Sequence, residues 1–336
     1  MAELSQAEKQ LLIAVKNVSR RKKDPDRGSL AEFGERFFDE DRVDWSDAYE
    51  SLTRSGHLQR KGNAYSLTAP GEKVAREVRR EDSIKGFNEW LVRSEESRAY
   101  SGFCERVYGM NLCQCNVMDM EQLNKLLDVL SLNESSRVLD LGCGIGSVTE
   151  YISDLTGARI TGVDFAEDAI IRARRRTRAK LNRLTYEVGD MNALRFPDRS
   201  FDTIIAIDTL YFVDDLEKTT ERMNAILAAD GQMAVFYSQM IGIEEPKELL
   251  LAGNTRFAQA LDKLQLRFQT WCFSENESEL WRKQKSIAEE LRAEFEREGY
   301  LDLYKSRIKE SEHVLQFVES GRVSRYLYHA KQADSG

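Results

Sequence analysis

The chain has 336 residues, a net charge of −8 and 41% apolar residues, a composition that supports one large or two ordinary globular domains. The negative charge argues against general affinity for nucleic acid or anionic membranes, and no apolar run approaches the roughly 20 residues of a membrane-spanning helix. The polar start of the chain lacks the pattern of a signal peptide, so we expect a cytoplasmic protein.

Residues 1–82 are expected to fold as a separate unit of three helices and a β-hairpin. The predicted helices and strands span residues 7–18, 30–38, 45–55, 58–60 and 64–67. Thr68 then suits the N-cap of a further helix, and Pro70 suits its first turn. This order of elements, with the GHL…Y-x-L-T-x-x-G segment, resembles a winged helix-turn-helix domain.

Charge does not favour DNA binding by this unit. Residues 1–80 contain 16 Lys and Arg against 14 Asp and Glu, a net charge of only +2. The third helix, which would enter the major groove, carries Asp47 and Glu50 against Arg54, and phosphates repel carboxylates. We therefore expect the unit to serve dimerisation, with a homodimer as the assembly, or substrate enclosure.

Residues 83–132 are predicted to be helical and rich in aromatic side chains. Three cysteines lie in this segment, at positions 104, 113 and 115. Their spacing does not suit a zinc site, and the whole chain has only 3 His. We therefore expect no metal and interpret the cysteines as reduced thiols.

Residues 137–165 are the most informative stretch, because they read as strand, glycine turn, helix and strand. An apolar run ends at Leu141, and Gly142, Gly144 and Gly146 follow at alternate positions. Glycines permit positive φ and a close approach of the backbone to a ligand, and the helix that begins after them offers free N–H groups. Asp164 ends the second strand, where a carboxylate can accept both hydroxyls of a ribose. A nucleoside-bearing cofactor is therefore predicted.

The details of the turn distinguish between cofactors. A dinucleotide fingerprint has its third glycine where this chain has Ser147. Asp140-x-Gly142-x-Gly144-x-Gly146 instead resembles the first motif of class I S-adenosylmethionine-dependent methyltransferases. A carboxylate before the turn would repel a pyrophosphate but suits the ammonium of a methionine moiety. The resemblance implies S-adenosylmethionine as the cofactor and an α/β, Rossmann-like core with a seven-stranded sheet.

Later segments resemble further motifs of this family in the same order. Gly189-Asp190-Met191 follows the third strand and resembles the adenine motif. Residues 200–213 are the predicted fourth strand, with Asp208 at its carboxyl end, where ligands bind in open α/β sheets. The resemblance implies a set of cofactor-binding residues: Asp140, Gly142, Cys143, Gly144, Gly146, Asp164, Phe165, Asp190, Met191 and Asp208.

The C-terminal half is predicted to complete the sheet around a helical insertion. A helix over residues 215–231 ends at Gly231 and precedes a fifth strand, residues 264–273 favour another strand, and residues 323–332 form the last, antiparallel strand. After the N-terminal unit, the resemblance implies a cap over the cofactor (residues 83–132) and the core (133–242). A helical substrate lid (243–320) and the last strand with a tail (321–336) follow.

Candidate acceptor-binding residues come from the cap, the fourth strand and the lid. They are Tyr100, Tyr108, Gln114, Tyr211 and Tyr304, and the lid also offers Trp281, Tyr300, Arg307 and His313. For any single one of these side chains, ordinary core packing is an open alternative.

The resulting prediction is methyl transfer to a small molecule or a natural-product intermediate. Such a displacement mainly requires positioning of the acceptor, and Asp208, Tyr211 and His313 are candidate bases if a proton must also leave. No D/N-P-P-Y sequence follows the fourth strand, so nucleic acid is not favoured as the substrate. Two alternatives stay open: intramolecular attack on the methionine chain of the cofactor, and a DNA-binding regulator that responds to the cofactor.

Overall fold

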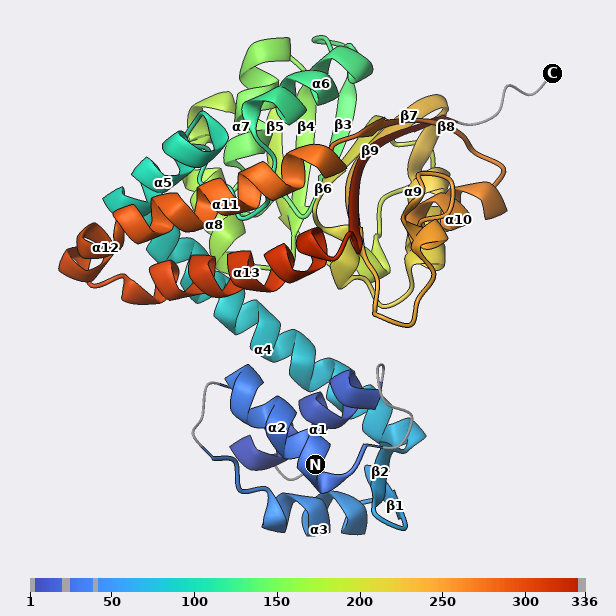
Figure 1. Cartoon of the computed structure of the whole chain (residues 1–336). Helices are drawn as coiled ribbons and strands as arrows, with labels where there is room; N and C mark the ends of the chain where they lie inside the picture. The colour runs from blue at the N-terminus through green and yellow to red at the C-terminus, as the bar shows by residue number, and fades with distance from the viewer. Residues whose placement is uncertain (1–3, 20–24, 39–41, 332–336) are drawn as a thin grey trace. The chain divides into compact units, whose positions relative to one another are not determined.

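The computed structural model of the chain describes residues 4–19, 25–38 and 42–331, and it divides into two compact units, Met1–Phe87 and Asn88–Gly336 (Figure 1). The division falls within the long helix α4 (Ala69–Glu96), shortly after the boundary predicted at residue 82. The predicted C-terminal tail after Lys331 lies outside the described residues. Among the residues described, no helix combines the length and the apolar character needed to cross a bilayer.

The first unit contains three helices and an antiparallel hairpin, in the order predicted. They are α1 (Gln6–Ser19), α2 (Arg27–Phe38), α3 (Ser46–Arg54), β1 (Leu58–Lys61) and β2 (Ala64–Leu67). Leu11, Leu30 and Leu52, one from each helix, are fully buried in a common apolar core. Thr68 caps α4 as expected, because its Oγ1 accepts from the Gly71 N–H at 3.1 Å.

Seven strands form one sheet in the second unit, in the order β5-β4-β3-β6-β7-β9-β8 (Figure 1). Their bounds are β3 (Arg137–Leu141), β4 (Arg159–Asp164), β5 (Leu184–Val188), β6 (Phe201–Ile207), β7 (Leu227–Met240), β8 (Arg267–Cys272) and β9 (Val323–Lys331). The first five in this list are parallel, and β9 runs antiparallel to both of its neighbours. The predicted seven-stranded, mostly parallel sheet is therefore confirmed.

Alternate residues of the central strands face two apolar layers. Leu139 and Leu141 of β3 lie in the layer that α9 and α10 cover, whereas Val138 lies in the layer covered by α6, α7 and α8. Both faces of the sheet are thus buried, as parallel strands require. The helices of these layers, and the 3₁₀ turns beside them, are α6 (Met120–Leu130), α7 (Ser147–Thr156), α8 (Glu167–Arg176), α9 (Leu216–Ile226), α10 (Arg256–Lys263), η1 (Arg178–Lys180), η2 (Met191–Ala193), η3 (Leu210–Phe212) and η4 (Lys247–Leu250).

Two boundaries differ from the prediction. α9 ends at Ile226 rather than at Gly231, because Leu227 already pairs with Phe201 in the sheet. The segment predicted as a helical lid also begins too early: α10 and β8 belong to the core, since Phe257 is fully buried and β8 pairs with β9.

Four helices form a further layer, which we call the helical cap. They are α5 (Arg98–Tyr108), α11 (Ser274–Glu290), α12 (Arg292–Glu298) and α13 (Leu301–Glu319), and α11 and α13 run side by side (Figure 1). Their apolar core is aromatic: Trp90 meets Tyr100 edge to face with ring centroids 5.2 Å apart, and Tyr100 stacks on Phe103 at 5.5 Å. The cap therefore has a core of its own, separate from the two layers of the sheet.

Candidate functional site

The turn between β3 and α7 has a positive φ at each of its three glycines, with values of 76° at Gly142, 54° at Gly144 and 71° at Gly146. The N–H groups of Gly142 and Cys143 both donate to the Val163 carbonyl, at 2.8 and 3.1 Å, and so tie the turn to the end of β4. α7 begins directly after the turn, so its first N–H groups point back toward it. The turn has the backbone geometry that the glycine pattern predicts.

The three glycines differ in the space beside them. A Cβ atom at Gly142 would lie 2.3 Å from Thr209, and one at Gly146 would lie 2.3 Å from Tyr186, so protein atoms fill both places. A Cβ atom at Gly144 would meet nothing within 4 Å. The turn is therefore open at Gly144, and a ligand can approach the backbone there.

Asp164 lies beside this open position and is oriented by backbone groups. Its Oδ2 accepts from the Gly144 N–H and its Oδ1 from the Ala166 N–H, both at 2.9 Å. Burial raises the pKa of Asp164 above its usual value, and these hydrogen bonds partly offset the effect. Each carboxylate oxygen still has a lone pair with which it can accept a hydroxyl group.

Asp140 lies before the turn, is 3% exposed and accepts a hydrogen bond of 2.5 Å from Thr149 Oγ1. Burial raises the pKa of Asp140 to about 7, although the Thr149 hydrogen bond lowers it, and the charge of Asp164 raises it further. A cationic group beside this carboxyl would favour its ionised form. The position thus suits a ligand with an ammonium group.

The other predicted cofactor residues lie at the same edge of the sheet, after β3, β4 and β5. Cys143 is in the turn, with its Sγ donating to the Gly144 carbonyl at 3.7 Å, and Phe165 directly follows β4. Asp190 precedes η2, where its Oδ1 accepts from the Asn192 N–H at 3.0 Å. Met191 is buried in the sheet layer that α9 covers. Ligands of open α/β sheets bind at this edge.

Asp208, at the end of β6, is held by a network of side chains that the sequence did not reveal. Arg325 of β9 donates to Asp208 Oδ1 from Nη1 at 2.5 Å and to Oδ2 from Nη2 at 2.9 Å. Arg325 is fully buried, and it also donates to Gln122 at 2.8 Å and lies 3.6 Å from Glu277. Burial lowers the pKa of Arg325, but the charge and hydrogen bonds of Asp208 and the charge of Glu277 together raise it above its usual value, so Arg325 stays protonated. We call Asp208, Arg325, Glu277 and Gln122 the Arg325 network.

Tyr211 joins this network through its hydroxyl group. The hydroxyl donates to Asp208 Oδ1 at 3.0 Å and accepts from the Ser238 N–H at 2.6 Å. Tyr211 is 40% exposed, and because these bonds hold its oxygen, the exposed part is the ring. Burial of the hydroxyl and the charge of Asp208 raise the pKa of Tyr211 well above its usual value. The third candidate base, His313, lies on α13 with its ring against Phe317.

The predicted acceptor-binding residues in the helical cap and in the loop after α5 are mostly buried and hydrogen-bonded. Tyr100 donates to the Gln114 carbonyl at 2.8 Å, and Tyr108 donates to Gln284 Oε1 at 3.3 Å. Gln114 is itself 3% exposed. Tyr304 is half-buried, with its ring beneath a guanidinium group of α12. The structure brings Tyr100 and Gln114 into contact, and Tyr108 shares their core.

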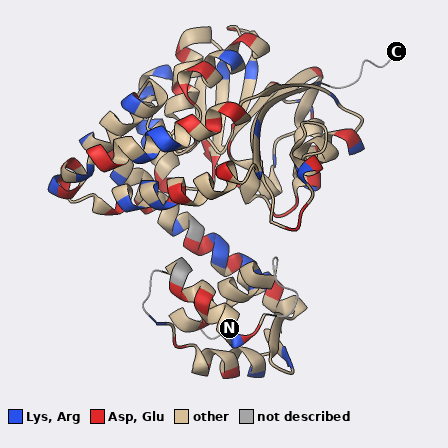
Figure 2. Ribbon diagram, viewed as in Figure 1, with Lys and Arg blue, Asp and Glu red and all other residues tan. Residues whose placement is uncertain are grey.

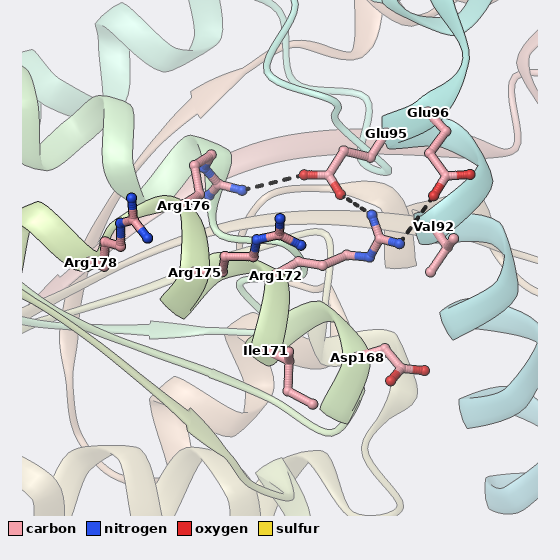
Figure 3. A pocket seen from close by; sticks show the side chains of 9 residues that line it. All are labelled: Val92, Glu95, Glu96, Asp168, Ile171, Arg172, Arg175, Arg176 and Arg178. Atoms are coloured by element: carbon pink, nitrogen blue, oxygen red, sulfur yellow. Dashed lines mark hydrogen bonds and ion pairs between the residues drawn. The ribbon is translucent and has the colours of Figure 1, made fainter.

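An open pocket of about 930 Å³ lies between the end of α4 and α8 (Figure 3). Its lining residues are Val92, Glu95, Glu96, Asp168, Ile171, Arg172, Arg175, Arg176 and Arg178. Arg172 forms ion pairs with Glu95 at 2.5 Å and with Glu96 at 3.2 Å, so part of the positive charge is neutralised within the pocket. None of the predicted cofactor-binding residues lines it, and we treat it as separate from the glycine turn.

In the part of the chain that the structure describes, no three His, Cys, Asp or Glu side chains are grouped so as to hold a metal ion. The cysteines of the cap region are free. Burial raises the pKa of Cys113 to about 11 and that of Cys115 to about 12, so both are neutral thiols.

Sequence comparisons identify the region around the glycine turn. Residues 138–231 match the methyltransferase domain family. Methyltransferase GfsG of Streptomyces halstedii is 31% identical over 117 residues, which are 34% of this chain and 41% of that protein. A malonyl-[acyl-carrier protein] O-methyltransferase of Bacillus anthracis is 32% identical over 141 residues, 42% of this chain and 49% of that protein. The chain thus aligns with less than half the length of these relatives.

A solved structure shows the same fold. Phosphoethanolamine N-methyltransferase 2 of Haemonchus contortus, in complex with phosphomonomethylethanolamine and S-adenosylhomocysteine, superposes with a TM-score of 0.60 at 19% identity. The superposition covers 74% of this chain and 60% of that one. Residues 138–231 therefore match a methyltransferase domain, and the second unit has the fold of this solved structure.

Proposed function

We propose that this chain transfers the methyl group of S-adenosylmethionine to a small molecule or a natural-product intermediate. One observation carries the proposal. Gly144, where the turn is open, donates its N–H to Asp164, so an accessible stretch of backbone and a carboxylate with lone pairs free for hydroxyl groups meet at one point. This is the arrangement that a nucleoside-bearing cofactor requires.

The residues around the turn fit each part of this cofactor. Asp164 would accept the ribose hydroxyls with its remaining lone pairs, Asp140 would face the ammonium of the methionine end, and Asp190 would accept the amino group of adenine. When bound, the cofactor supplies a methyl group on a positively charged sulfur, which is already an activated leaving group.

The chain then has two tasks: to hold the acceptor in line with the methyl group and, for a hydroxyl or amine acceptor, to let a proton leave. Asp208 is poorly suited to take that proton, because both of its oxygens are bonded to Arg325. Tyr211 is also poorly suited, because its hydroxyl donates to Asp208. We propose that both residues position the end of β6, and the role of His313 as a base stays a prediction.

A small acceptor is supported by the names of the related proteins. The relative from Bacillus anthracis is named for the malonyl group of a malonyl-[acyl-carrier protein], and the structure from Haemonchus contortus contains phosphomonomethylethanolamine. The missing D/N-P-P-Y sequence after β6 also argues against a nucleic-acid base as the acceptor.

The test compares Gly144→Val with Gly299→Val. Both glycines have positive φ and open space beside them, but Gly299 ends α12 in the cap, so it controls for backbone strain. We expect calorimetry to show at least a hundredfold loss of S-adenosylhomocysteine affinity for Gly144→Val, because the side chain would occupy the cofactor's place, and little change for Gly299→Val. Equal affinity of both variants and the unchanged chain would contradict the placement of the cofactor.

The reaction is tested with the unchanged chain. It is incubated with S-adenosylmethionine alone and with pools of metabolites, and the products are identified by mass spectrometry. Methyl transfer predicts S-adenosylhomocysteine and a product heavier by one methylene unit, only when metabolites are present. Methylthioadenosine formed from the cofactor alone would instead indicate intramolecular attack on the methionine chain.

We further propose that the first unit is a winged-helix-like domain that serves assembly or substrate enclosure rather than DNA binding. Asp47 and Glu50 are exposed on α3 beside Arg54, and Figure 2 shows acidic as well as basic positions over the unit. A DNA-binding domain neutralises several phosphates with basic side chains. Light scattering on the full chain should show a dimer, and gel shifts with random duplex DNA at about 150 mM salt should show no complex. A monomer that binds DNA tightly would contradict this role.

A further inference from the structure

The helical cap contains a buried group of polar side chains that the fold does not explain. Arg307 of α13 is 4% exposed, and Ser311, one turn later on the same helix, is fully buried. Gln284 of α11 is also fully buried. α11 and α13 are joined at this level by an ion pair of 2.9 Å between Lys285 and Glu312, the neighbours of Gln284 and Ser311. We call Arg307, Ser311 and Gln284 the Arg307 cluster.

Most hydrogen-bonding atoms of this cluster have no partner. Arg307 Nε and Nη1, Gln284 Nε2 and Ser311 Oγ are buried and make no hydrogen bond. Glu310 Oε2 lies 2.8 Å from Arg307 Nη2, but it is outside hydrogen-bond geometry, and its side chain is 38% exposed. A buried guanidinium with unsatisfied N–H groups is unfavourable unless an acceptor completes it. The unpaired atoms of Arg307, Gln284 and Ser311 are all donors or can donate, so the partner that the Arg307 cluster lacks is an acceptor.

Aromatic side chains surround the charge. The Arg307 guanidinium lies 5.1 Å from the centre of the Trp90 ring, and Tyr108 donates its hydroxyl to Gln284 Oε1. Burial raises the pKa of both Tyr100 and Tyr108, and the charge of Arg307 partly offsets the effect in each, which places both hydroxyls near the guanidinium. The tyrosines therefore stay neutral, and Arg307 supplies the positive charge of the cluster.

The loop between α5 and α6 connects this cluster to the cofactor edge of the sheet. Tyr100 donates to the carbonyl of Gln114 in that loop, and the Val117 N–H donates to Asp208 at 3.3 Å. Cys115 lies in the loop between Gln114 and Val117, and the charges of both Arg307 and Asp164 act on the pKa of its thiol. A molecule bound at the Arg307 cluster would thus lie across one loop from the ribose-binding carboxylate.

We propose that the Arg307 cluster binds an anionic group, a carboxylate or a phosphate, of the methyl acceptor. Arginine suits such groups because its planar N–H donors match their oxygens and keep their charge when buried. The assignment rests on the proposed methyl transfer and names its substrate class: an acceptor whose anionic end is held in the cap and whose reacting atom points toward the sheet.

The proposal is tested by titrating the full chain, loaded with S-adenosylhomocysteine, with malonate, with inorganic phosphate and with malonamide. Malonamide has the shape of malonate without its charge. We expect one or both anions to bind at least tenfold more tightly than malonamide, and Arg307→Gln to weaken anion binding at least tenfold. Arg297→Gln, at an exposed arginine of α12, is the matched control and should change binding less than twofold. The anion that binds more tightly shows whether the anionic group of the methyl acceptor is a carboxylate or a phosphate.

A second variant covers the case in which Arg307→Gln does not fold. Gln284→Glu keeps the size of the side chain but places a carboxylate in the cluster, so it should weaken anion binding at least tenfold. Binding of neither anion by the unchanged chain, or equal anion binding by the folded variants, would overturn the proposal. S-adenosylhomocysteine affinity is measured on each protein beforehand, so a chain that binds cofactor but no anion refutes the substrate class without refuting methyl transfer.

Discussion

The glycine turn and the Arg325 network meet the same edge of the sheet, but they hold their carboxylates in different ways. Asp164 in the turn is held by two backbone N–H groups, each of which uses one lone pair of an oxygen. Asp208 in the network is held by a buried guanidinium that bonds to both of its oxygens, and Tyr211 adds a further bond. The first carboxylate is oriented and still able to accept, whereas the second is neutralised by its partner.

This difference suggests that Asp164 binds a ligand, whereas Asp208 supports the fold. Backbone N–H groups carry only partial charges and leave a carboxylate able to accept from a ligand, whereas a buried guanidinium that bonds to both oxygens neutralises the charge of the carboxylate. We therefore expect substitutions in the turn to reduce cofactor affinity and substitutions in the Arg325 network to reduce the stability of the fold.

The largest effect should come from Asp208→Asn. Arg325 is fully buried, so loss of its main partner leaves a charge compensated only by Glu277 at 3.6 Å. Removal of one partner of a buried pair costs about 3–5 kcal/mol. We expect a loss of this size in the free energy of unfolding, measured with denaturant.

Asp202→Asn is the matched control, because Asp202 forms the same two-point pair with Arg137 at the surface, where both side chains are at least 41% exposed. Exposed pairs contribute about 1 kcal/mol or less. If Asp208→Asn lowered turnover a hundredfold at unchanged stability, Asp208 would be a catalytic residue and the contrast between the two sites would be lost.

The second effect, Asp164→Ala, should reduce S-adenosylmethionine affinity by about 2–4 kcal/mol, because two charge-assisted hydrogen bonds to the ribose are lost. Calorimetry measures it, with Asp168→Ala as the control, since Asp168 lies in the first turn of α8 and lines the separate pocket. The same instrument should detect no binding of NAD(P)H. A micromolar affinity for NAD(P)H would contradict the choice of S-adenosylmethionine over a dinucleotide, which was made because Ser147 stands where a dinucleotide fingerprint has its third glycine.

The glycine turn could be predicted from the sequence because it is local. Three glycines, the carboxylate before them and Asp164 lie within 25 residues, and short-range backbone geometry determines how they meet. The same family resemblance implied a seven-stranded sheet with an antiparallel last strand, and the structure confirms both.

The Arg325 network could not be predicted, because its members come from α6, β6, α11 and β9 and meet only in the folded chain. One available signal was Arg325 itself, the charged residue in a start of the last strand that is otherwise apolar and aromatic except for Ser324. Arg307 was singled out among the aromatic residues of the lid, but helical spacing alone cannot show that its guanidinium is buried with Nε and Nη1 unpartnered.

The third effect is a pH dependence that arises in the turn. Asp140 has a pKa of about 7 without ligand, and the ammonium of the cofactor favours its ionised form, so binding below pH 7 must release a proton. We expect S-adenosylmethionine affinity to fall about tenfold between pH 8 and pH 6. Calorimetry in buffers of different ionisation enthalpy should detect the released proton.

The unliganded fold should show the opposite trend. The pKa of Asp140 is higher in the folded than in the unfolded chain, so its stabilising effect is fully present below about pH 4 and is lost as the pH rises through about 7. Asp140→Asn should remove both trends. A wild-type affinity that is constant from pH 6 to pH 8 would mean that Asp140 does not face the cationic end of the cofactor.

The smallest effect should come from Tyr211→Phe. The hydroxyl donates to Asp208 and accepts from the Ser238 N–H, so its removal costs about 1 kcal/mol of unfolding free energy. Because Asp208 keeps Arg325, we expect less than a tenfold loss of turnover and an unchanged pH profile. Tyr326→Phe on β9, which removes the hydrogen bond from the Tyr326 hydroxyl to the Leu250 carbonyl, serves as the control. A hundredfold loss of turnover with the basic limb of the pH profile abolished would make Tyr211 the base, and the edge of β6 would then belong to the reacting site rather than to its support.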